Sequence, residues 1–261
     1  MLPENKPIIF DTPREFRAIT IFFAHDIHKG SELHDAQKWA AFKKLVLSQP
    51  NHYIVWVGDY CENAVVGSKS DIYSQTIPPA AQKEWFTEQL VELADRTIAI
   101  VPGNHEDNRI TRTVGLYPIY DCALIAGLGG RYRQTYAVVD IGVGNRGHGE
   151  KETRQQRYFG FITHRLRDCK AYNGSDFVEG VDWCAYGHDH DPSDHARSKL
   201  CYDSSNKCMV QRDVEVIDSG SFMTFGGYAP RAGMRPKSSK IYTLELFSGR
   251  KKRLETHGFH L

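Results

Sequence analysis

Three strand-like runs alternate with two helix-like segments over the first 101 residues of the chain. Short runs rich in β-branched and aromatic residues predict buried strands over 17–24, 53–57 and 97–101. Apolar residues at helical spacing predict amphipathic helices over 34–48 and 79–94, the second with a proline in its first turn. Strand–helix–strand–helix–strand is the βαβ pattern, and it predicts an α/β fold.

The rest of the chain is richer in strands and predicts a second sheet packed on the first. The polar stretches 63–78 and 144–156 break the pattern, and we expect them to be surface loops or insertions. Because no linker and no internal repeat interrupts the chain, we expect residues 1–261 to form a single domain. The expected strands cover 136–143, 159–163, 183–186, 210–217 and 240–246.

The composition is that of an ordinary soluble globular protein. With 33 basic and 32 acidic residues, bulk charge does not direct the chain to nucleic acid. No apolar stretch approaches the roughly 18 residues that a membrane helix needs, and residues 1–6 carry no sign of a secretory signal. The 6 cysteines form no C-x-x-C pair, so we expect reduced thiols and a cytoplasmic location.

Histidine is the outstanding residue type, with 12 in the chain, and several of them lie in short motifs that follow predicted strands. Open α/β sheets bind ligands at the carboxyl ends of their strands, where the loops converge. Five such loops could bring Asp, His and Asn side chains into one cluster. The motifs are Asp26-Ile27-His28, Gly58-Asp59, Gly103-Asn104-His105-Glu106, Thr163-His164 and Gly187-His188-Asp189-His190.

Each motif taken singly has a plain structural explanation. Asp26 suits a turn at a strand end, and Asn104 suits a helix N-cap. A lone histidine such as His164 is more often a satisfied core residue than a ligand. Two histidines two residues apart after a strand, as at His188 and His190, are less common. All the motifs together, in this order, are hard to obtain by chance and indicate one functional site.

The series of motifs resembles the sequence blocks of the calcineurin-like metallophosphoesterase superfamily, which run D-x-H, G-D-x-x, G-N-H-[DE], H and G-H-x-H. All of these blocks are present in order, and they span Asp26 to His190. The resemblance implies two packed mixed β-sheets flanked by helices, in a four-layer sandwich. It also implies two divalent metal ions held between the strand ends.

Carried over position by position, the resemblance implies a ligand set for each metal. One metal would take Asp26, His28, Asp59 and His190, and the other Asp59, Asn104, His164 and His188. Such carboxylate, imidazole and amide donors suit Mn²⁺, Fe²⁺, Zn²⁺ or Ni²⁺, and we expect Mn²⁺ to serve in vitro. Two cations about 4 Å apart repel strongly, so the shared carboxylate of Asp59 and a bridging hydroxide are needed between them.

The resemblance also implies a mechanism, in which the metal-bridging hydroxide attacks phosphorus in line. The histidine of the G-N-H block is not a ligand in the family, so His105 is the candidate general acid or transition-state stabiliser. Glu62 occupies the position from which an acidic residue orients that histidine in some relatives. The alternative for Glu62 is an exposed loop carboxylate.

The expected substrate is a phosphate ester, and a phosphodiester (a nucleotide or nucleic acid) is favoured. The protein phosphatases of the superfamily carry Asp-Arg-Gly after the second block, and this chain has no arginine there. The chain most resembles compact stand-alone phosphodiesterases and exonuclease-like members. Alternatives are a phosphomonoesterase or protein phosphatase, and a non-catalytic interaction scaffold with the same fold. Candidate substrate-binding residues are Arg109, Phe225 and Arg231.

Basic residues gather in three segments, 154–167, 231–237 and 250–253, and aromatic residues lie among the first two groups. Arginine beside aromatic rings suits a nucleotide or a single-stranded nucleic acid. The competing explanation is that these are solvated faces and core aromatics. The segment 219–233 follows the last motif, and we expect it to wall the pocket, with glycines that allow a close approach of the ligand.

Overall fold

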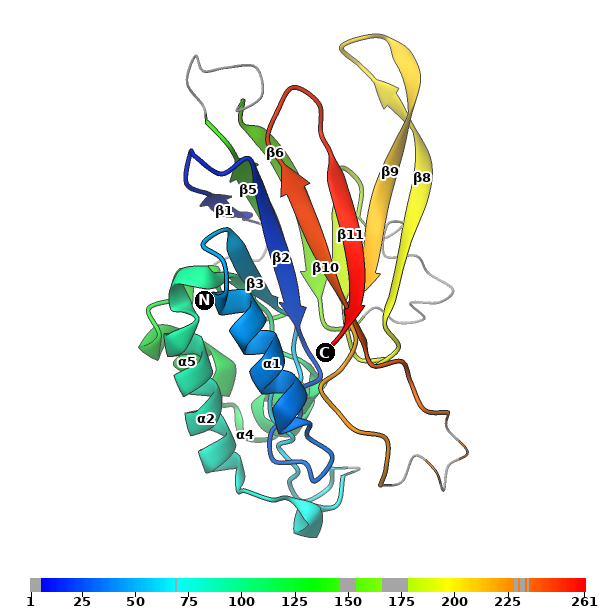
Figure 1. The fold of residues 1–261 in the computed structure, drawn as a ribbon. Coiled ribbons are helices and arrows are strands. Elements are labelled where there is room, and N and C mark those ends of the chain that lie inside the picture. The colour runs from blue at the N-terminus through cyan, green and yellow to red at the C-terminus, as the bar shows by residue number, and fades with distance from the viewer. Residues whose placement is uncertain are drawn as a thin grey trace.

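The computed structural model describes residues 6–68, 70–145, 154–165, 178–227, 230, 233 and 235–261. Two mixed β-sheets pack face to face, and helices cover one of them (Figure 1). This confirms the expected fold of two packed mixed sheets flanked by helices. The six-stranded sheet has the order β1 (Ile8–Asp11), β5 (Tyr136–Val143), β6 (Gln156–Thr163), β7 (Trp183–Tyr186), β9 (Cys208–Asp218), β8 (Ser193–Asp203). The five-stranded sheet has the order β11 (Leu254–His260), β10 (Lys240–Phe247), β2 (Ala18–Ala24), β3 (His52–Trp56), β4 (Thr97–Ile100).

Alternate residues of the central strands face two different cores. In β3, Tyr53 and Val55 pack against the other sheet, where they meet residues such as Ile141. Ile54 and Trp56 point to the opposite face and pack against the helices. Because side chains alternate along a strand, a run that is apolar throughout must be covered on both faces.

The helices that cover the five-stranded sheet come from the first half of the chain (Figure 1). Helix α1 begins after Asp35, whose carboxylate accepts the N–H of Lys38 at 2.9 Å, and α2 has Pro79 in its first turn. The main helices are α1 (Ala36–Leu47), α2 (Pro79–Glu92) and α5 (Pro118–Ile125). Shorter helical segments are η1 (Ile72–Ser74), η2 (Ala94–Arg96), α3 (Asn104–Glu106), the π-helical η3 (Asp107–Thr111), α4 (Arg112–Val114) and η4 (Gly129–Arg131).

The expected elements are present, but several bounds were wrong and some elements were missed. The loop expected over 144–156 was placed one residue too far, because strand β6 already begins at Gln156. Residues 146–153 of that expected loop lie outside the described residues. The described residues of segment 63–78 form a loop that contains the short η1. The missed elements are β1, β8, β11 and α5.

Strands β8 and β9 form a long ribbon that projects past the rest of its sheet (Figure 1). They pair over 193–203 and 208–218, whereas β9 pairs with β7 only over 215–218. The outer part of the ribbon therefore has only two strands. Leu200, Tyr202 and Met209 are exposed there.

The strand directions determine where the site lies. Strands β2, β3 and β4 are parallel neighbours in one sheet, and β6 and β7 are parallel neighbours in the other. The loops that follow parallel neighbours lie at the same edge of a sheet. No helix in the described part of the chain is long and apolar enough to cross a membrane.

Candidate metal centre

The predicted ligands converge at the carboxyl ends of five strands. Asp26 and His28 follow β2, Asp59 follows β3, and Asn104 follows β4. From the other sheet, His164 follows β6, while His188 and His190 follow β7.

Three overlapping groups of donor atoms form at this edge, and in each the atoms lie within 4.8 Å of one another. Two of them consist of predicted ligands alone, and the third joins His28 and Asp59 to His105. The first contains Asp26, His28 and His190, with His190 Nε2 3.2 Å from Asp26 Oδ1. The second contains Asp59, His164 and His188, with His164 Nε2 3.1 Å from Asp59 Oδ2. Asp59 Oδ2 is also 3.9 Å from His28 Nε2, so this carboxylate connects the clusters.

Buried donor atoms without hydrogen-bond partners point to metal binding. Asp26 Oδ1, His28 Nε2, Asn104 Oδ1 and His164 Nε2 are buried and make no hydrogen bond within the described part of the chain. Buried polar atoms nearly always have a partner, because leaving one unpaired costs free energy. The donors are oxygen and imidazole nitrogen, which suit borderline divalent ions. The residues therefore fit the metals that the sequence predicts.

The backbone at five of the predicted ligands is in the left-handed region. The φ angles are 50° at Asp26, 49° at His28, 53° at Asp59, 80° at His188 and 55° at His190. Non-glycine residues seldom adopt positive φ, and such conformations gather at functional sites, where the surrounding structure holds them. The loops are therefore shaped to direct these side chains.

Two glycines of the motifs allow the loops to approach each other. A Cβ atom on Gly58, where φ is +95°, would lie 2.6 Å from Gly103 Cα and 2.7 Å from the His164 ring. A Cβ on Gly103 would lie 2.1 Å from Asp59 Oδ1. Any larger residue would push the second and third motifs apart.

The charges of the centre favour cations. Burial alone would raise the pKa of Asp59, but His164 and then His105 hold it well below its usual value. Burial alone would lower the pKa of His28, but the neighbouring carboxylates of Asp26 and Glu62 raise it to about 10. His164 behaves in the same way, because the charge of Asp59 outweighs burial and raises its pKa to about 9. The carboxylates therefore determine the sign of the electrostatic potential at the centre, which is negative and favours cations.

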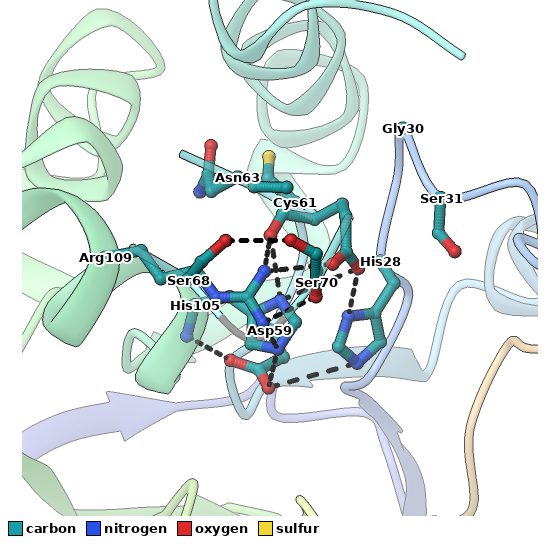
Figure 2. A network of polar contacts seen from close by, with 12 residues as sticks. His28, Gly30, Ser31, Asp59, Cys61, Asn63, Ser68, Ser70, His105 and Arg109 are labelled. Atoms are coloured by element: carbon teal, nitrogen blue, oxygen red, sulfur yellow. Dashed lines mark hydrogen bonds and ion pairs between the residues drawn. The ribbon is translucent and has the colours of Figure 1, made fainter. Parts of the chain in front are cut away.

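His105 lies beside His28 and Asp59 and is held through its Nδ1 atom (Figure 2). This nitrogen is 2.9 Å from the backbone carbonyl oxygen of Glu62 and 3.7 Å from its carboxylate Oε2. The shorter contact of His105 is therefore to the Glu62 main chain, and the orienting role expected of the Glu62 carboxylate stays a prediction. The carboxylate Oε2 lies 3.1 Å from Nδ1 of His28 instead. Glu62 is buried, so the alternative of an exposed loop carboxylate is wrong.

Of the two predicted substrate residues that the structure describes, Arg109 is the one that contacts the centre (Figure 2). Its guanidinium donates to His105 Nε2 at 2.8 Å, Glu62 Oε1 at 2.9 Å and Ser70 Oγ at 2.9 Å. Phe225 is 47% exposed, and the residue before it, Thr224, pairs with Leu33, so this segment runs beside the loop before α1. Arg231 lies outside the described residues.

Sequence reasoning missed three buried residues that support the ligands. Glu106 accepts the N–H groups of Asp59 at 3.1 Å and Gly103 at 2.8 Å, and so ties the second motif to the third. His25 Nδ1 lies 2.7 Å from Asp26 Oδ2, and its Nε2 lies 3.6 Å from Asp218. The acidic position of the G-N-H-E motif indicated Glu106, but nothing in the sequence indicated the other two.

Two basic residues of the predicted segments, Arg157 and Lys252, form ion pairs away from this edge, whereas Arg165 directly follows the predicted ligand His164. Arg157 bonds Asp140 and Asp11 at 2.6 and 2.7 Å, and it lies near the start of β6. His164 follows the end of that strand, so at about 3.3 Å per residue the two are roughly 20 Å apart. Lys252 pairs with Asp182 at 2.7 Å. These contacts agree with the explanation that the charges belong to solvated faces.

The chain belongs to the calcineurin-like phosphoesterase family, whose model matches residues 19–192. The matched segment contains every motif from Asp26 to His190. The family implies a phosphoric ester hydrolase that uses divalent metals and takes a phosphate ester as substrate. A search of curated proteins finds no match.

Solved structures with a similar fold include three proteins of low sequence identity. A predicted phosphoesterase from Streptococcus pneumoniae has 12% identity and a TM-score of 0.37, with 93% of this chain and 98% of that chain covered. Vps29 from Chaetomium thermophilum has 12% identity and a TM-score of 0.38, with 93% and 95% covered. A metallophosphoesterase from Sphaerobacter thermophilus has 13% identity and a TM-score of 0.41, with 93% and 88% covered. At these values the likeness says nothing about activity.

Proposed function

We propose that this protein is a dinuclear metal-dependent phosphodiesterase acting on a nucleotide or nucleic acid. The observation that carries the proposal is the position of Asp59, whose carboxylate lies 3.1 Å from His164 in one donor cluster and 3.9 Å from His28 in the other. A carboxylate shared in this way suits two neighbouring cations, because it offsets their mutual repulsion.

The chain would hold one ion with Asp26, His28, Asp59 and His190, and the other with Asp59, Asn104, His164 and His188. When bound, such a pair of ions lowers the pKa of a water molecule and neutralises charge on phosphoryl oxygens. We propose Mn²⁺ as the ion most suited to assays in vitro, with Fe²⁺, Zn²⁺ and Ni²⁺ as alternatives. Glu62 fixes the ring of His28 through Nδ1, which leaves Nε2 turned toward Asp26 and Asp59.

His105 is proposed to exchange a proton with the leaving oxygen through its Nε2 atom. Its Nδ1 lies 2.9 Å from the Glu62 carbonyl, so a proton on Nδ1 is held there, and Nε2 is the nitrogen that can exchange a proton once a substrate oxygen replaces its contact with Arg109. Burial lowers the pKa of His105 to about 4 in this arrangement. An anionic phosphate beside the ring would raise that pKa, and so favour the protonated form that a general acid needs.

Arg109 is proposed to bind a phosphoryl oxygen, since its guanidinium already reaches His105 Nε2. The same guanidinium pairs with Glu62 at 2.9 Å, and this neutralises part of its charge. A singly charged diester requires less positive charge than a doubly charged monoester. The pairing therefore supports the choice of a diester.

The first test is hydrolysis of bis-p-nitrophenyl phosphate and p-nitrophenyl phosphate by metal-free protein reloaded with Mn²⁺. We expect diester hydrolysis that needs metal and is lost in Asp59→Asn. Asp95→Asn is the matched control, because Asp95 is exposed on η2. A preference for the monoester would identify a phosphatase. Folded protein without turnover on any divalent ion would reject catalysis and favour an interaction scaffold.

A further inference from the structure

His25 is a buried histidine that directly precedes the predicted ligand Asp26, just after the end of β2. The residue is 0% exposed, and among the described residues it belongs to none of the groups of converging metal donors. Both of its ring nitrogens contact other parts of the chain instead. A buried polar side chain that touches a metal ligand, without being a ligand itself, is placed to orient that ligand.

The contacts of the Nε2 atom determine which nitrogen of His25 carries the proton. Nε2 accepts the backbone N–H of Ser219 at 3.2 Å, so this nitrogen has no proton of its own. Asp218 Oδ1 is 3.6 Å from the same nitrogen, which is too far for a hydrogen bond. The proton of the neutral ring is therefore on Nδ1, and it points to Asp26.

Two N–H groups occupy one oxygen atom of the Asp26 carboxylate. His25 Nδ1 donates to Oδ2 at 2.7 Å, and the backbone N–H of His188 donates to the same oxygen at 2.8 Å. The other oxygen, Oδ1, is buried and makes no hydrogen bond within the described residues. It lies 3.2 Å from His190 Nε2 and 3.6 Å from His28 Nε2. The protein therefore binds Oδ2 and leaves Oδ1 as the donor atom that faces the other ligands.

The loop after β7 packs directly on the hydrogen bond between His25 and Asp26. A Cβ atom on Gly187 would lie 2.8 Å from His25 Nδ1 and 2.9 Å from Asp26 Oδ2. Ser219, which donates to the other side of the His25 ring, directly follows β9. The ring of His25 is therefore fixed between the ends of β2, β7 and β9, and so is the N–H that it offers to Asp26.

We propose that His25 is a positioning residue that reserves Oδ1 of Asp26 for a metal ion and so sets the affinity of the site formed by Asp26, His28 and His190. Without the N–H of His25, the carboxylate loses one of the two donors that fix its orientation. This inference rests on the proposed function for the presence of two ions. It concerns only one of them, because Asp26 belongs to only one of the two proposed ligand sets.

Asparagine and leucine at position 25 form a matched pair, because both branch at Cγ and they differ in whether they carry an N–H donor. The amide of asparagine can take the place of Nδ1, whereas leucine cannot donate. Titration calorimetry of the metal-free protein with Mn²⁺ measures the affinity for each ion without catalysis. We expect His25→Leu to bind one ion about 10- to 100-fold more weakly and the other ion as the wild type does. His25→Asn should bind both ions nearly as the wild type does.

A double variant shows whether His25 acts through Asp26. In Asp26→Asn, the further change His25→Leu should not weaken the remaining ion, because the carboxylate that His25 positions is already gone. His52→Leu is the control and should leave both affinities unchanged. His52 lies at the opposite end of β3 from Asp59, and its Nδ1 is 2.8 Å from the Leu45 carbonyl oxygen.

Equal Mn²⁺ affinities in His25→Leu and His25→Asn would overturn the inference. A loss that affects both ions equally, or that persists in the Asp26→Asn protein, would overturn it as well. If His25→Leu does not fold, nitrogen-15 NMR of the histidine rings in the wild type decides. A proton on Nδ1 of His25 supports the inference, and a proton on Nε2 alone overturns it.

The same titration separates this inference from the proposed function. Two ions bound by the wild type, without turnover of either p-nitrophenyl ester, would reject the proposed function alone, since the affinities of the His25 variants are measured without substrate. A wild-type protein that binds no Mn²⁺ would overturn both.

Discussion

The guanidinium of Arg109 donates to Nε2 of His105 at 2.8 Å, on the side of the ring opposite to its Glu62 contact. The ring is therefore held at both nitrogen atoms. Arg109 lies on η3, directly after the short helix that begins with Asn104, so the third motif and its following turn supply both residues. A substrate oxygen that reaches His105 must replace this contact or share it.

Replacement of Arg109 should weaken phosphate binding and turnover together. We expect Arg109→Ala to lower kcat/KM for bis-p-nitrophenyl phosphate by about 10- to 100-fold, the effect of losing a charged hydrogen bond. Arg109→Lys should recover little, because an ammonium cannot make the forked contacts to His105, Glu62 and Ser70. Arg112→Ala is the control, since Arg112 is exposed and pairs with Asp107. Wild-type kinetics in Arg109→Ala would exclude the role.

The position of Asp59 predicts how metal content responds to substitution. Asp59→Asn should weaken the binding of both ions, whereas Asp26→Asn should weaken chiefly one. Metal analysis after dialysis against a fixed low Mn²⁺ concentration measures the stoichiometry directly. We expect values well below two for Asp59→Asn and near one for Asp26→Asn. Equal stoichiometry in the two variants would show that Asp59 is not shared.

Metal binding should release protons and tighten as the pH rises. The pKa values of His28 and His164, about 10 and about 9, keep both rings protonated at neutral pH without metal. A metal can bind only the deprotonated ring, so each proton must leave, and affinity increases with pH until it passes those pKa values. Titration calorimetry in buffers of different ionisation enthalpy counts the protons. Uptake of protons, or affinity independent of pH from 6 to 9, would contradict this.

The hydroxyl of Tyr158 links the two sheets and should contribute to stability. It lies 2.6 Å from the Phe247 carbonyl oxygen at the end of β10 and accepts the N–H of Arg253 at 3.1 Å. Because Tyr158 is fully buried on β6, Tyr158→Phe leaves these groups without their partner. We expect the free energy of unfolding to fall by about 1 to 2 kcal/mol. Urea denaturation measures it, with Tyr202→Phe on the exposed ribbon expected to change little.

The central strands could be predicted because their side chains are covered on both faces. Phe22 and Phe23 of β2 enter different cores, so the sequence there is apolar throughout. Strand β8 escaped prediction for the opposite reason. It is an edge strand whose residues are mostly exposed, so neither an apolar run nor an alternation indicates it.

The predicted ligands could be found because each follows a strand end, and the strand order then brings them together. The contacts that support these ligands could not be predicted from the sequence. Contacts such as His25 to Asp218 join residues almost 200 positions apart, and their geometry depends on how β9 lies against β2 and β7. Whether His105 contacts the carbonyl or the carboxylate of Glu62 likewise depends on the backbone conformation at Glu62. No residue pattern in the sequence predicts that conformation.

The left-handed backbone at Asp26, His28, Asp59, His188 and His190 has a consequence for how this chain can evolve. In the metal-free protein, these backbone conformations and the buried unpaired donor atoms beside them make folding less favourable in free energy. Glycine at one of these positions would relieve the strain and remove a donor. Without metal, we therefore expect inactive variants to be more thermostable than the wild type. Selection for thermal stability alone would then replace the metal-binding residues. If related proteins keep these residues, that retention would itself indicate that the site has a function.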